Sequence, residues 1–229
     1  CALLVCLRLA LTGFQQAYIW VGGAPLDDEL MFRAANHITA GQWLGAYDYL
    51  TLSKAMFFPV WLALLHALHL PYLISGAALW CGAALLAAFA FSTLWRKKDP
   101  AQGRVLTLGL FAVLAFLPSS WAAYTLRVYR DNIFPALCLY FFAGMAGMAL
   151  RAVFTPEKPL WPWLAAAGAG LACGYLDRED AGLFLLPFAA AATGIVAVVL
   201  VGKRRWRALA AQLIPYLMLG AGVLTFCTL

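Results

Sequence analysis

The chain has 229 residues, of which 65% are hydrophobic and only 11% are charged. A soluble domain is about half apolar and about a quarter charged, so this composition excludes a soluble globular protein and predicts a multispanning membrane protein. The net charge of +6 would also suit a nucleic-acid partner. The basic residues, however, cluster in short connections between apolar runs, as the positive-inside rule predicts, and we expect no nucleic acid.

About seven apolar runs are long enough to be interpreted as membrane spans, and they predict an all-α, polytopic helix bundle. These runs cover residues 1–21, 72–95, 105–123, 132–152, 161–176, 181–201 and 208–228. Because the chain begins without methionine and ends inside an apolar run, we interpret residues 1–229 as a single transmembrane module that is truncated at both ends. The six cysteines all lie in apolar runs, which predicts neither a disulfide framework nor a metal–thiolate site.

The longest polar interval, residues 22–71, is predicted to be an extracytoplasmic loop that contains juxtamembrane helices. Its first part predicts an amphipathic helix with one apolar stripe (Leu30, Met31, Ala34, Ala35 and Ile38). The run 56–70 is shorter than the roughly 20 residues that a helix needs to cross a bilayer, and we interpret it as a second juxtamembrane helix. If it does not cross, the three basic connections share the cytoplasmic side (96–104, 151–158 and 202–207).

The acidic residues that open this loop are the candidates for a catalytic base. Asp27 and Asp28 are adjacent and are followed by Glu29. Neighbouring like charges favour protonation of one carboxylate, which suits a proton acceptor that works near neutrality. Asp27 is expected to cap a helix that begins at Glu29, which leaves Asp28 to face a cavity. We therefore prefer Asp28 as the base and keep Asp27 as the alternative.

Basic residues at three places are candidates for binding an anion. Lys54 precedes the aromatic run KAMFFP, Arg130 and Asp131 lie in RVYRDN, and Arg178 and Glu179 lie in LDREDAG. Each also has a purely structural interpretation, because lysines at a membrane boundary snorkel and Arg–Asp pairs often cap helices. His66 and His69 have helical spacing without a carboxylate in their own segment, so we expect no metal site.

Taken in order, these motifs resemble the bacterial GT-C membrane glycosyltransferases, and within them the protein O-mannosyltransferase and aminoarabinose-transferase type. The matching features are the DDE segment after the first span, KAMFFP, RVYRDN and LDREDAGLFLLP. The resemblance implies that the acidic pair supplies the catalytic carboxylate and that the basic residue before the aromatic run contacts a lipid phosphate. Two departures are that the acids read DDE rather than DE and that further C-terminal spans are absent from this chain.

The function implied by the resemblance is transfer of a sugar from a polyprenyl-phosphate donor to a hydroxyl of a glycan, lipid or protein acceptor, with inversion. Asp28 or Asp27 would take the proton, and basic and neighbouring polar residues would hold the donor phosphate (Lys54, Arg130, Arg178, Glu179, Asp131 and Arg33). No metal or cofactor is implied. The expected location is the bacterial inner membrane, with the site facing the periplasm. The alternative is a transporter or flippase subunit for lipid-linked sugars, or a non-catalytic membrane assembly protein.

Overall fold

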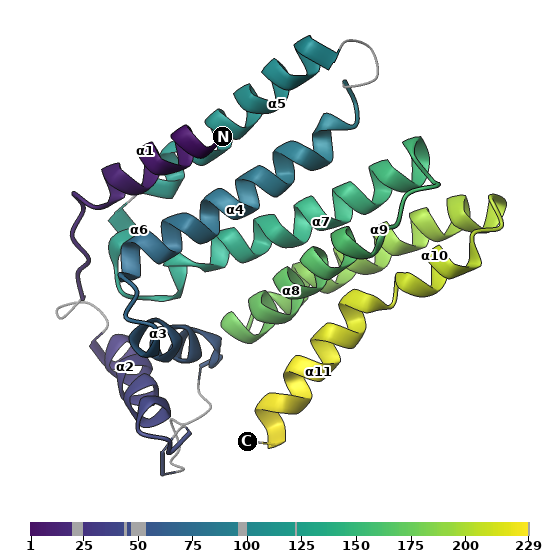
Figure 1. Cartoon of the computed structure of the whole chain (residues 1–229). Coiled ribbons are helices and arrows are strands. Elements are labelled where there is room, and N and C mark those ends of the chain that lie inside the picture. The colour runs from purple at the N-terminus through teal and green to yellow at the C-terminus, as the bar shows by residue number, and fades with distance from the viewer. Residues whose placement is uncertain (20–24, 44, 47–53, 96–99, 122, 229) are drawn as a thin grey trace.

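The computed structural model describes residues 1–19, 25–43, 45–46, 54–95, 100–121 and 123–228, and the regular structure within these ranges is helical (Figure 1). One isolated parallel bridge joins Tyr18 to Arg127. The elements are α1 (Ala2–Thr12), α2 (Pro25–Thr39), α3 (Phe57–Ala67), α4 (Tyr72–Ser92), α5 (Pro100–Ala115), η1 (Pro118–Trp121), α6 (Ala123–Leu126), η2 (Arg130–Asn132), α7 (Phe134–Phe154), α8 (Trp161–Asp177), α9 (Gly182–Gly202), α10 (Trp206–Ala211) and α11 (Ile214–Thr228).

Five stretches within the described residues are long and apolar enough to cross a membrane, which supports a multi-pass membrane protein. They are Tyr72–Ser92, Pro100–Trp121, Phe134–Phe154, Gly182–Gly202 and Trp206–Thr228. The predicted number of about seven spans is not confirmed. Helix α1 has 11 residues and α8 has 17, and a rise of about 1.5 Å per residue makes both shorter than a hydrocarbon core of roughly 30 Å.

Proline interrupts two of the predicted runs. The run 105–123 divides at Pro118 into α5 and the 3₁₀ turn η1. The run 208–228 divides into α10 and α11, and Pro215 lies at the start of α11. Proline has no backbone N–H and its ring clashes with the carbonyl four residues earlier, which here belongs to Ala211, the last residue of α10.

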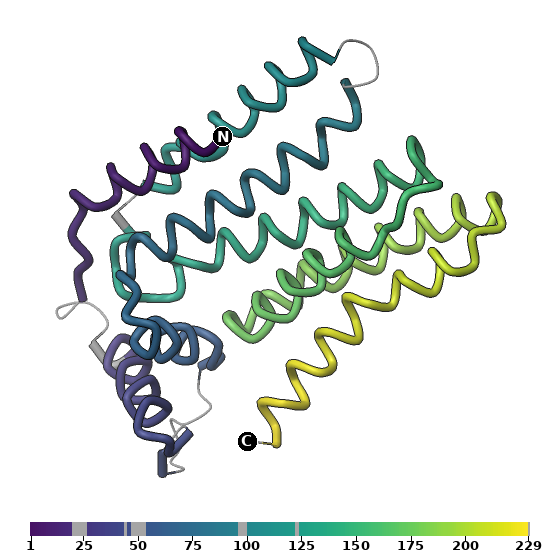
Figure 2. The backbone as a smooth tube through the Cα atoms, viewed as in Figure 1, coloured from purple at the N-terminus to yellow at the C-terminus, as the bar shows by residue number. Residues whose placement is uncertain are grey.

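The centre of the bundle is α7, which packs against α4 on one flank and α8 on the other, while α5 lies beyond α4 and α11 beyond α8 (Figure 2). Small residues permit this close approach, as expected where no hydrophobic effect drives helices together. A Cβ built on Gly170 of α8 would lie 2.5 Å from the backbone nitrogen of Phe141 in α7. Glycine is therefore required at this crossing.

The two short helices α2 and α3 lie together at one end of the bundle (Figure 1). Four residues of the predicted apolar stripe of α2 are buried (Leu30, Met31, Ala34 and Ala35), and the fifth, Ile38, is partly buried. At the other end, the Lys203 ammonium group donates to the Ala152 carbonyl (3.0 Å), which brings two of the basic connections together. Residues 96–99 of the third basic connection lie outside the described residues.

Candidate functional site

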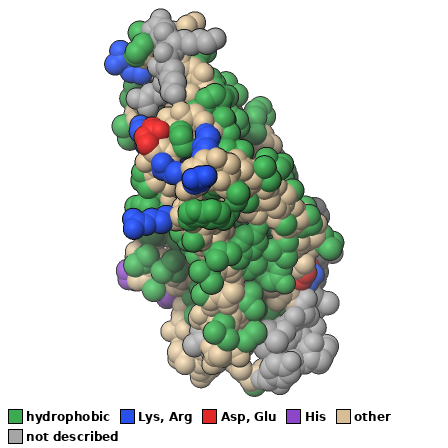
Figure 3. All heavy atoms as spheres, turned by 90° about the vertical axis from the view of Figure 1, so that its right-hand side faces the viewer, with side chains coloured by type: hydrophobic (Ala, Val, Ile, Leu, Met, Phe, Trp, Pro, Cys, Tyr) green, Lys and Arg blue, Asp and Glu red, His purple; other side chains and the backbone are tan. Residues whose placement is uncertain are grey.

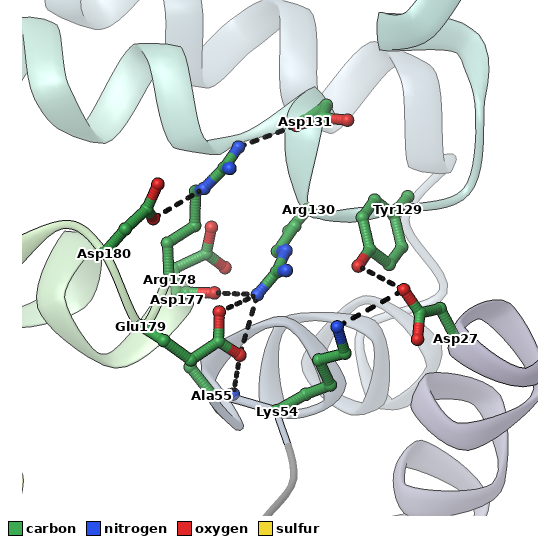
Figure 4. A network of polar contacts seen from close by, with 10 residues as sticks. All are labelled: Asp27, Lys54, Ala55, Tyr129, Arg130, Asp131, Asp177, Arg178, Glu179 and Asp180. Atoms are coloured by element: carbon green, nitrogen blue, oxygen red, sulfur yellow. Dashed lines mark hydrogen bonds and ion pairs between the residues drawn. The ribbon is translucent and has the colours of Figure 1, made fainter. Parts of the chain in front are cut away.

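Polar side chains from four separate segments meet at the end of the bundle that carries α2 and α3 (Figure 4). They come from the first turn of α2, the residues before α3, the η2 turn with the residue before it, and the end of α8 with its connection to α9. We name this group the polar cluster (Asp27, Lys54, Tyr129, Arg130, Asp131, Asp177, Arg178, Glu179 and Asp180). Ion pairs and hydrogen bonds between these segments hold them to one another.

Asp27 presents a partly exposed carboxylate at the edge of the polar cluster. Its side chain is 35% exposed, and the Lys54 ammonium nitrogen lies 3.4 Å from Oδ2. The Tyr129 hydroxyl donates to the same oxygen at 3.2 Å. The Tyr129 ring lies beneath two guanidinium groups, with the Arg127 carbon 4.5 Å and the Arg130 carbon 5.2 Å from its centroid. Two donors therefore orient Asp27 while part of the carboxylate stays accessible.

Asp28 is placed differently from its neighbour, because its side chain is only 1% exposed. Both carboxylate oxygens accept from Arg127, Oδ2 from Nε at 3.1 Å and Oδ1 from Nη2. This bond raises the pKa of Arg127, as expected for a guanidinium that donates to a carboxylate in a fork. Asp28 therefore joins α2 to the segment before η2 and does not face an open cavity.

The predicted start of this helix was wrong, and the actual start explains why Asp27 is partly exposed while Asp28 is buried. Helix α2 begins at Pro25, not at Glu29, so both aspartates lie in its first turn and Asp27 does not cap a helix that begins after it. Proline is favoured in the first turn because its missing N–H would be unpaired there anyway. Neighbours in a helix point in directions about 100° apart, which sends one carboxylate inward and leaves the other at the surface.

Buried Arg130 and exposed Glu179 form the central link of the polar cluster. Arg130 Nη1 donates to Glu179 Oε2 at 2.7 Å and to Oε1 at 3.0 Å. Glu179 Oε1 also accepts from the Ala55 backbone N–H at 2.7 Å. Burial alone would raise the pKa of Glu179, but its own and the Ala55 backbone N–H groups and Arg130 lower it overall. This link holds the residue after Lys54 against the α8–α9 connection.

Arg178 lies on the solvent side of this link. It donates to Asp131 (3.2 Å) and to Asp180 (3.1 Å), and it is 31% exposed. Its guanidinium carbon lies 5.0 Å from the centroid of the Phe134 ring. A guanidinium that is held flat and partly open to solvent can exchange a carboxylate partner for a phosphate.

Asp177 is a residue of the polar cluster to which the sequence analysis gave no role. It is fully buried, and neither side-chain oxygen has a hydrogen-bond partner. Burial raises its pKa well above the ordinary value, and the charges of Arg130 and Arg178 only partly oppose this shift. A buried carboxyl without a hydrogen bond is costly when ionised, so its surroundings favour protonation of Asp177.

The structure brings together six of the eight predicted site residues (Asp27, Lys54, Arg130, Asp131, Arg178 and Glu179). The other two are Asp28, which is buried against Arg127, and Arg33, which is exposed on α2 and is not part of the polar cluster. Residues 44 and 47–53 of the predicted loop motif lie outside the described residues. Tyr129 and Arg127 were visible only as neighbours of Arg130 in RVYRDN, and no sequence signal marked their contacts with the aspartates.

A second polar region lies between α1, α4 and the η1 turn. A cavity of about 50 Å³ is lined there by Arg8, Thr12, Ser120 and Asn132, among others. Arg8 is 2% exposed, donates to the Thr12 hydroxyl (2.7 Å) and the Ser120 carbonyl (2.9 Å), and stacks on Trp121 at 3.5 Å. These contacts account for a charged residue inside α1.

No protein-family model, no curated protein and no solved structure matches this chain significantly. Within the described part of the chain, no group of three or more His, Cys, Asp or Glu side chains is arranged to hold a metal ion.

Proposed function

We propose that the chain belongs to a membrane glycosyltransferase of the GT-C type, which transfers a sugar from a polyprenyl-phosphate donor to an acceptor hydroxyl with inversion. The observation that carries this proposal is the placement of Asp27. A partly exposed carboxylate lies beside a lysine and a tyrosine hydroxyl, and Arg178 is close by in the same cluster (Figure 4). A base next to cations is what displacement of a phosphate leaving group requires.

In this proposal Asp27, rather than Asp28, is the general base. A base must come within hydrogen-bond reach of the proton that it removes, and 35% of the Asp27 side chain is accessible. Asp28 is occupied on both oxygens by Arg127, so it supports the position of α2. The resemblance noted in the sequence points to the acidic pair as a whole, and the greater exposure of Asp27 supports its choice as the base.

The donor phosphate would be held by Lys54 and Arg178. Both are about one-third exposed, and both now pair with carboxylates that are themselves partly exposed. Such pairs contribute roughly 0–1 kcal/mol, so the negatively charged phosphodiester of the donor can displace them. Arg130 is buried and bonded to Glu179. Its part is to fix the α8–α9 connection and to add positive potential.

In this proposal, the contact between Asp27 and Lys54 links removal of the acceptor proton to departure of the lipid phosphate. The acceptor oxygen attacks the anomeric carbon as its proton passes to Asp27, and the bond from that carbon to the phosphate oxygen breaks. The electron pair leaves with the lipid phosphate, whose negative charge increases. Protonation of Asp27 removes the negative charge that competes with the phosphate for Lys54, so the ammonium group then stabilises the leaving phosphate alone.

The test is sugar transfer by the full-length protein, with Asp27→Asn compared against Glu29→Gln. Both variants lose one carboxylate from the first turns of α2, but Glu29 is exposed and lies outside the polar cluster. Asp27→Asn should lose roughly 10²–10⁴ in turnover while it still binds the polyprenyl-phosphate donor. Full activity of Asp27→Asn, in a preparation where the parent transfers sugar, would refute the assignment of the base.

A transporter for lipid-linked sugars is the second candidate, and the polar cavity at Arg8 is the observation that favours it, because buried charges often mark a transport path. The cavity of about 50 Å³ has room for a few water molecules but not for a sugar. In proteoliposomes that contain a lipid-linked sugar and no acceptor, the glycosyltransferase leaves the donor in its original leaflet. Protein-dependent movement of the donor across the bilayer would support the transporter.

We further propose that the polar cluster faces the outside of a bacterial inner membrane. The reason is the basic character of the opposite end, which the positive-inside rule makes cytoplasmic. In a cysteine-free background, a cysteine introduced at Glu179 should react with an impermeant reagent added to intact cells. One introduced at Gln102 should not. The reverse pattern would invert the orientation.

A further inference from the structure

A groove with an unusual concentration of positive charge lies at the end of the bundle opposite the polar cluster. It has a volume of about 740 Å³ and runs between the α7–α8 connection and the start of α10. We name it the basic groove and define it by six of its lining residues (Lys158, Trp161, Arg204, Arg205, Trp206 and Arg207). Figure 3 looks onto this side of the molecule and shows Lys and Arg side chains gathered among hydrophobic ones.

The charges of the basic groove are poorly compensated. Glu157 is the one acidic residue in its lining, and among the described residues no carboxylate forms an ion pair with Lys158, Arg204 or Arg207. Arg205 donates to the Pro156 carbonyl and so fixes the two walls of the groove to each other. The remaining cations keep their donors for a ligand, and like charges held this close favour an anionic one.

Arg204 occupies a backbone position that suits glycine. The Arg204 N–H donates to Val201 O and the Arg205 N–H donates to Leu200 O, both at 2.9 Å, which is the pattern of a Schellman motif at the end of α9. Its φ is 51°, in the left-handed region that residues with a Cβ adopt at a cost. Glycine would make the same turn without strain. The turn geometry therefore does not explain the arginine, whereas a ligand for its guanidinium would.

Two tryptophans place the groove at the level of lipid head groups. Trp161 is 60% exposed and Trp206 is 62% exposed, and they begin α8 and α10. Two candidate membrane spans meet at this point, one ending at Gly202 and the next beginning at Trp206. Exposed tryptophans at the ends of spans lie in the interfacial region of the bilayer, where lipid phosphates are the abundant anions.

We propose that the basic groove binds the head group of an anionic phospholipid, with the phosphodiester oxygens accepting from Arg204 and Arg207. Guanidinium groups match the geometry of phosphate oxygens, and basic pockets between helices at the cytoplasmic interface suit such head groups. The tryptophans would then pack against the glycerol region. This site does not depend on the proposed transferase activity, because it lies at the opposite end of the bundle.

The test measures lipid binding by the full chain in a zwitterionic detergent, with native mass spectrometry to count bound lipids. Phosphatidylglycerol is the probe, phosphatidylcholine is the neutral control, and glycerol phosphate tests a soluble phosphate. Arg204→Gly and Arg207→Ala are each compared with Arg104→Ala, which removes an equal charge from α5. Each groove variant should weaken phosphatidylglycerol binding about fivefold (about 1 kcal/mol), and Arg104→Ala should not.

The use of glycine at position 204 separates binding from folding, because it removes the charge and relieves the backbone at the same time. Arg204→Gly should unfold at the same temperature as the parent or higher. Three results would overturn the proposal: binding unchanged in both groove variants, binding weakened equally by Arg104→Ala, or displacement of the lipid by glycerol phosphate at similar concentration. The last would assign the groove to a soluble phosphate compound.

Discussion

The buried pair of Asp28 and Arg127 makes a strong prediction about stability. Removing one partner of a buried, doubly hydrogen-bonded pair leaves the other charge uncompensated and costs about 3–5 kcal/mol. Asp28 is 1% exposed and Arg127 is 17% exposed, so Asp28→Asn should fall in this range. The equivalent change at Asp27, whose pair with Lys54 is open to solvent, should cost about 1 kcal/mol or less. Adjacent aspartates should therefore differ by several kcal/mol.

Thermal unfolding of the purified protein in one detergent measures this difference. For a chain of this size, 1 kcal/mol corresponds to roughly 2–4 °C, so Asp28→Asn should lower the midpoint by about 6–20 °C and Asp27→Asn by no more than about 4 °C. In a double-mutant cycle, Arg127→Gln should cost much less in the Asp28→Asn background than in the parent. If Asp28→Asn unfolds with the parent but loses transfer, Asp28 takes part in the chemistry and our reasoning from burial is wrong.

Three further variants probe other contacts. Tyr129→Phe removes the hydrogen bond to Asp27 but keeps the ring beneath the guanidinium groups, so kcat/KM for transfer should fall about tenfold while the unfolding midpoint stays close to that of the parent. Burial raises the pKa of Asp177 above its ordinary value of 3.8, so the folded state binds more protons than the unfolded state, and stability falls as the pH rises above that value. Asp177→Asn should therefore raise the unfolding midpoint at neutral pH, and this gain should disappear in acid. Gly170→Leu should destabilise the folded protein by about 1–3 kcal/mol or more, because a Cβ at Gly170 meets the α7 backbone. A Cβ at Gly194 meets open space, so the control Gly194→Leu should be tolerated.

The helical architecture could be predicted from the sequence because apolar run length reports directly on membrane-spanning helices. The amphipathic stripe of α2 follows from helical periodicity, and the short α3 follows from the length of its apolar run. The number of spans was harder to predict than the helical architecture. An apolar composition continues past Thr12, where α1 ends, and composition alone does not show where a helix ends. Pro118 and Pro215 were visible in the sequence, but the breaks near them depend on packing around each proline.

The polar cluster was predictable in part of its membership and not in its internal arrangement. Charged residues in an apolar chain are rare and expensive, so those near the ends of apolar runs were natural candidates, and the alternation of spans sends them to one end of the bundle. Which of the two carboxylates is buried depends on where the helix begins, and the predicted and actual starts differ by about one turn. The sequence suggested a helix start at Glu29, whereas the start at Pro25 rotates Asp28 towards Arg127 and Asp27 towards Lys54.

The ion pairs in and beside the polar cluster differ in burial, and in the proposed reaction this difference separates the groups that would react from those that would only support them. Arg127 with Asp28 and Arg130 with Glu179 each include one buried partner, so breaking them exposes a charge to a low-dielectric interior. Lys54 with Asp27 and Arg178 with Asp131 are partly exposed on both sides, and water can take over either partner. A negatively charged ligand can therefore enter between the exposed pairs without disturbing the buried ones. In the proposed reaction, the two pairs with a buried partner would keep α2, η2 and the α8–α9 connection in register while Asp27 and Lys54 change partners.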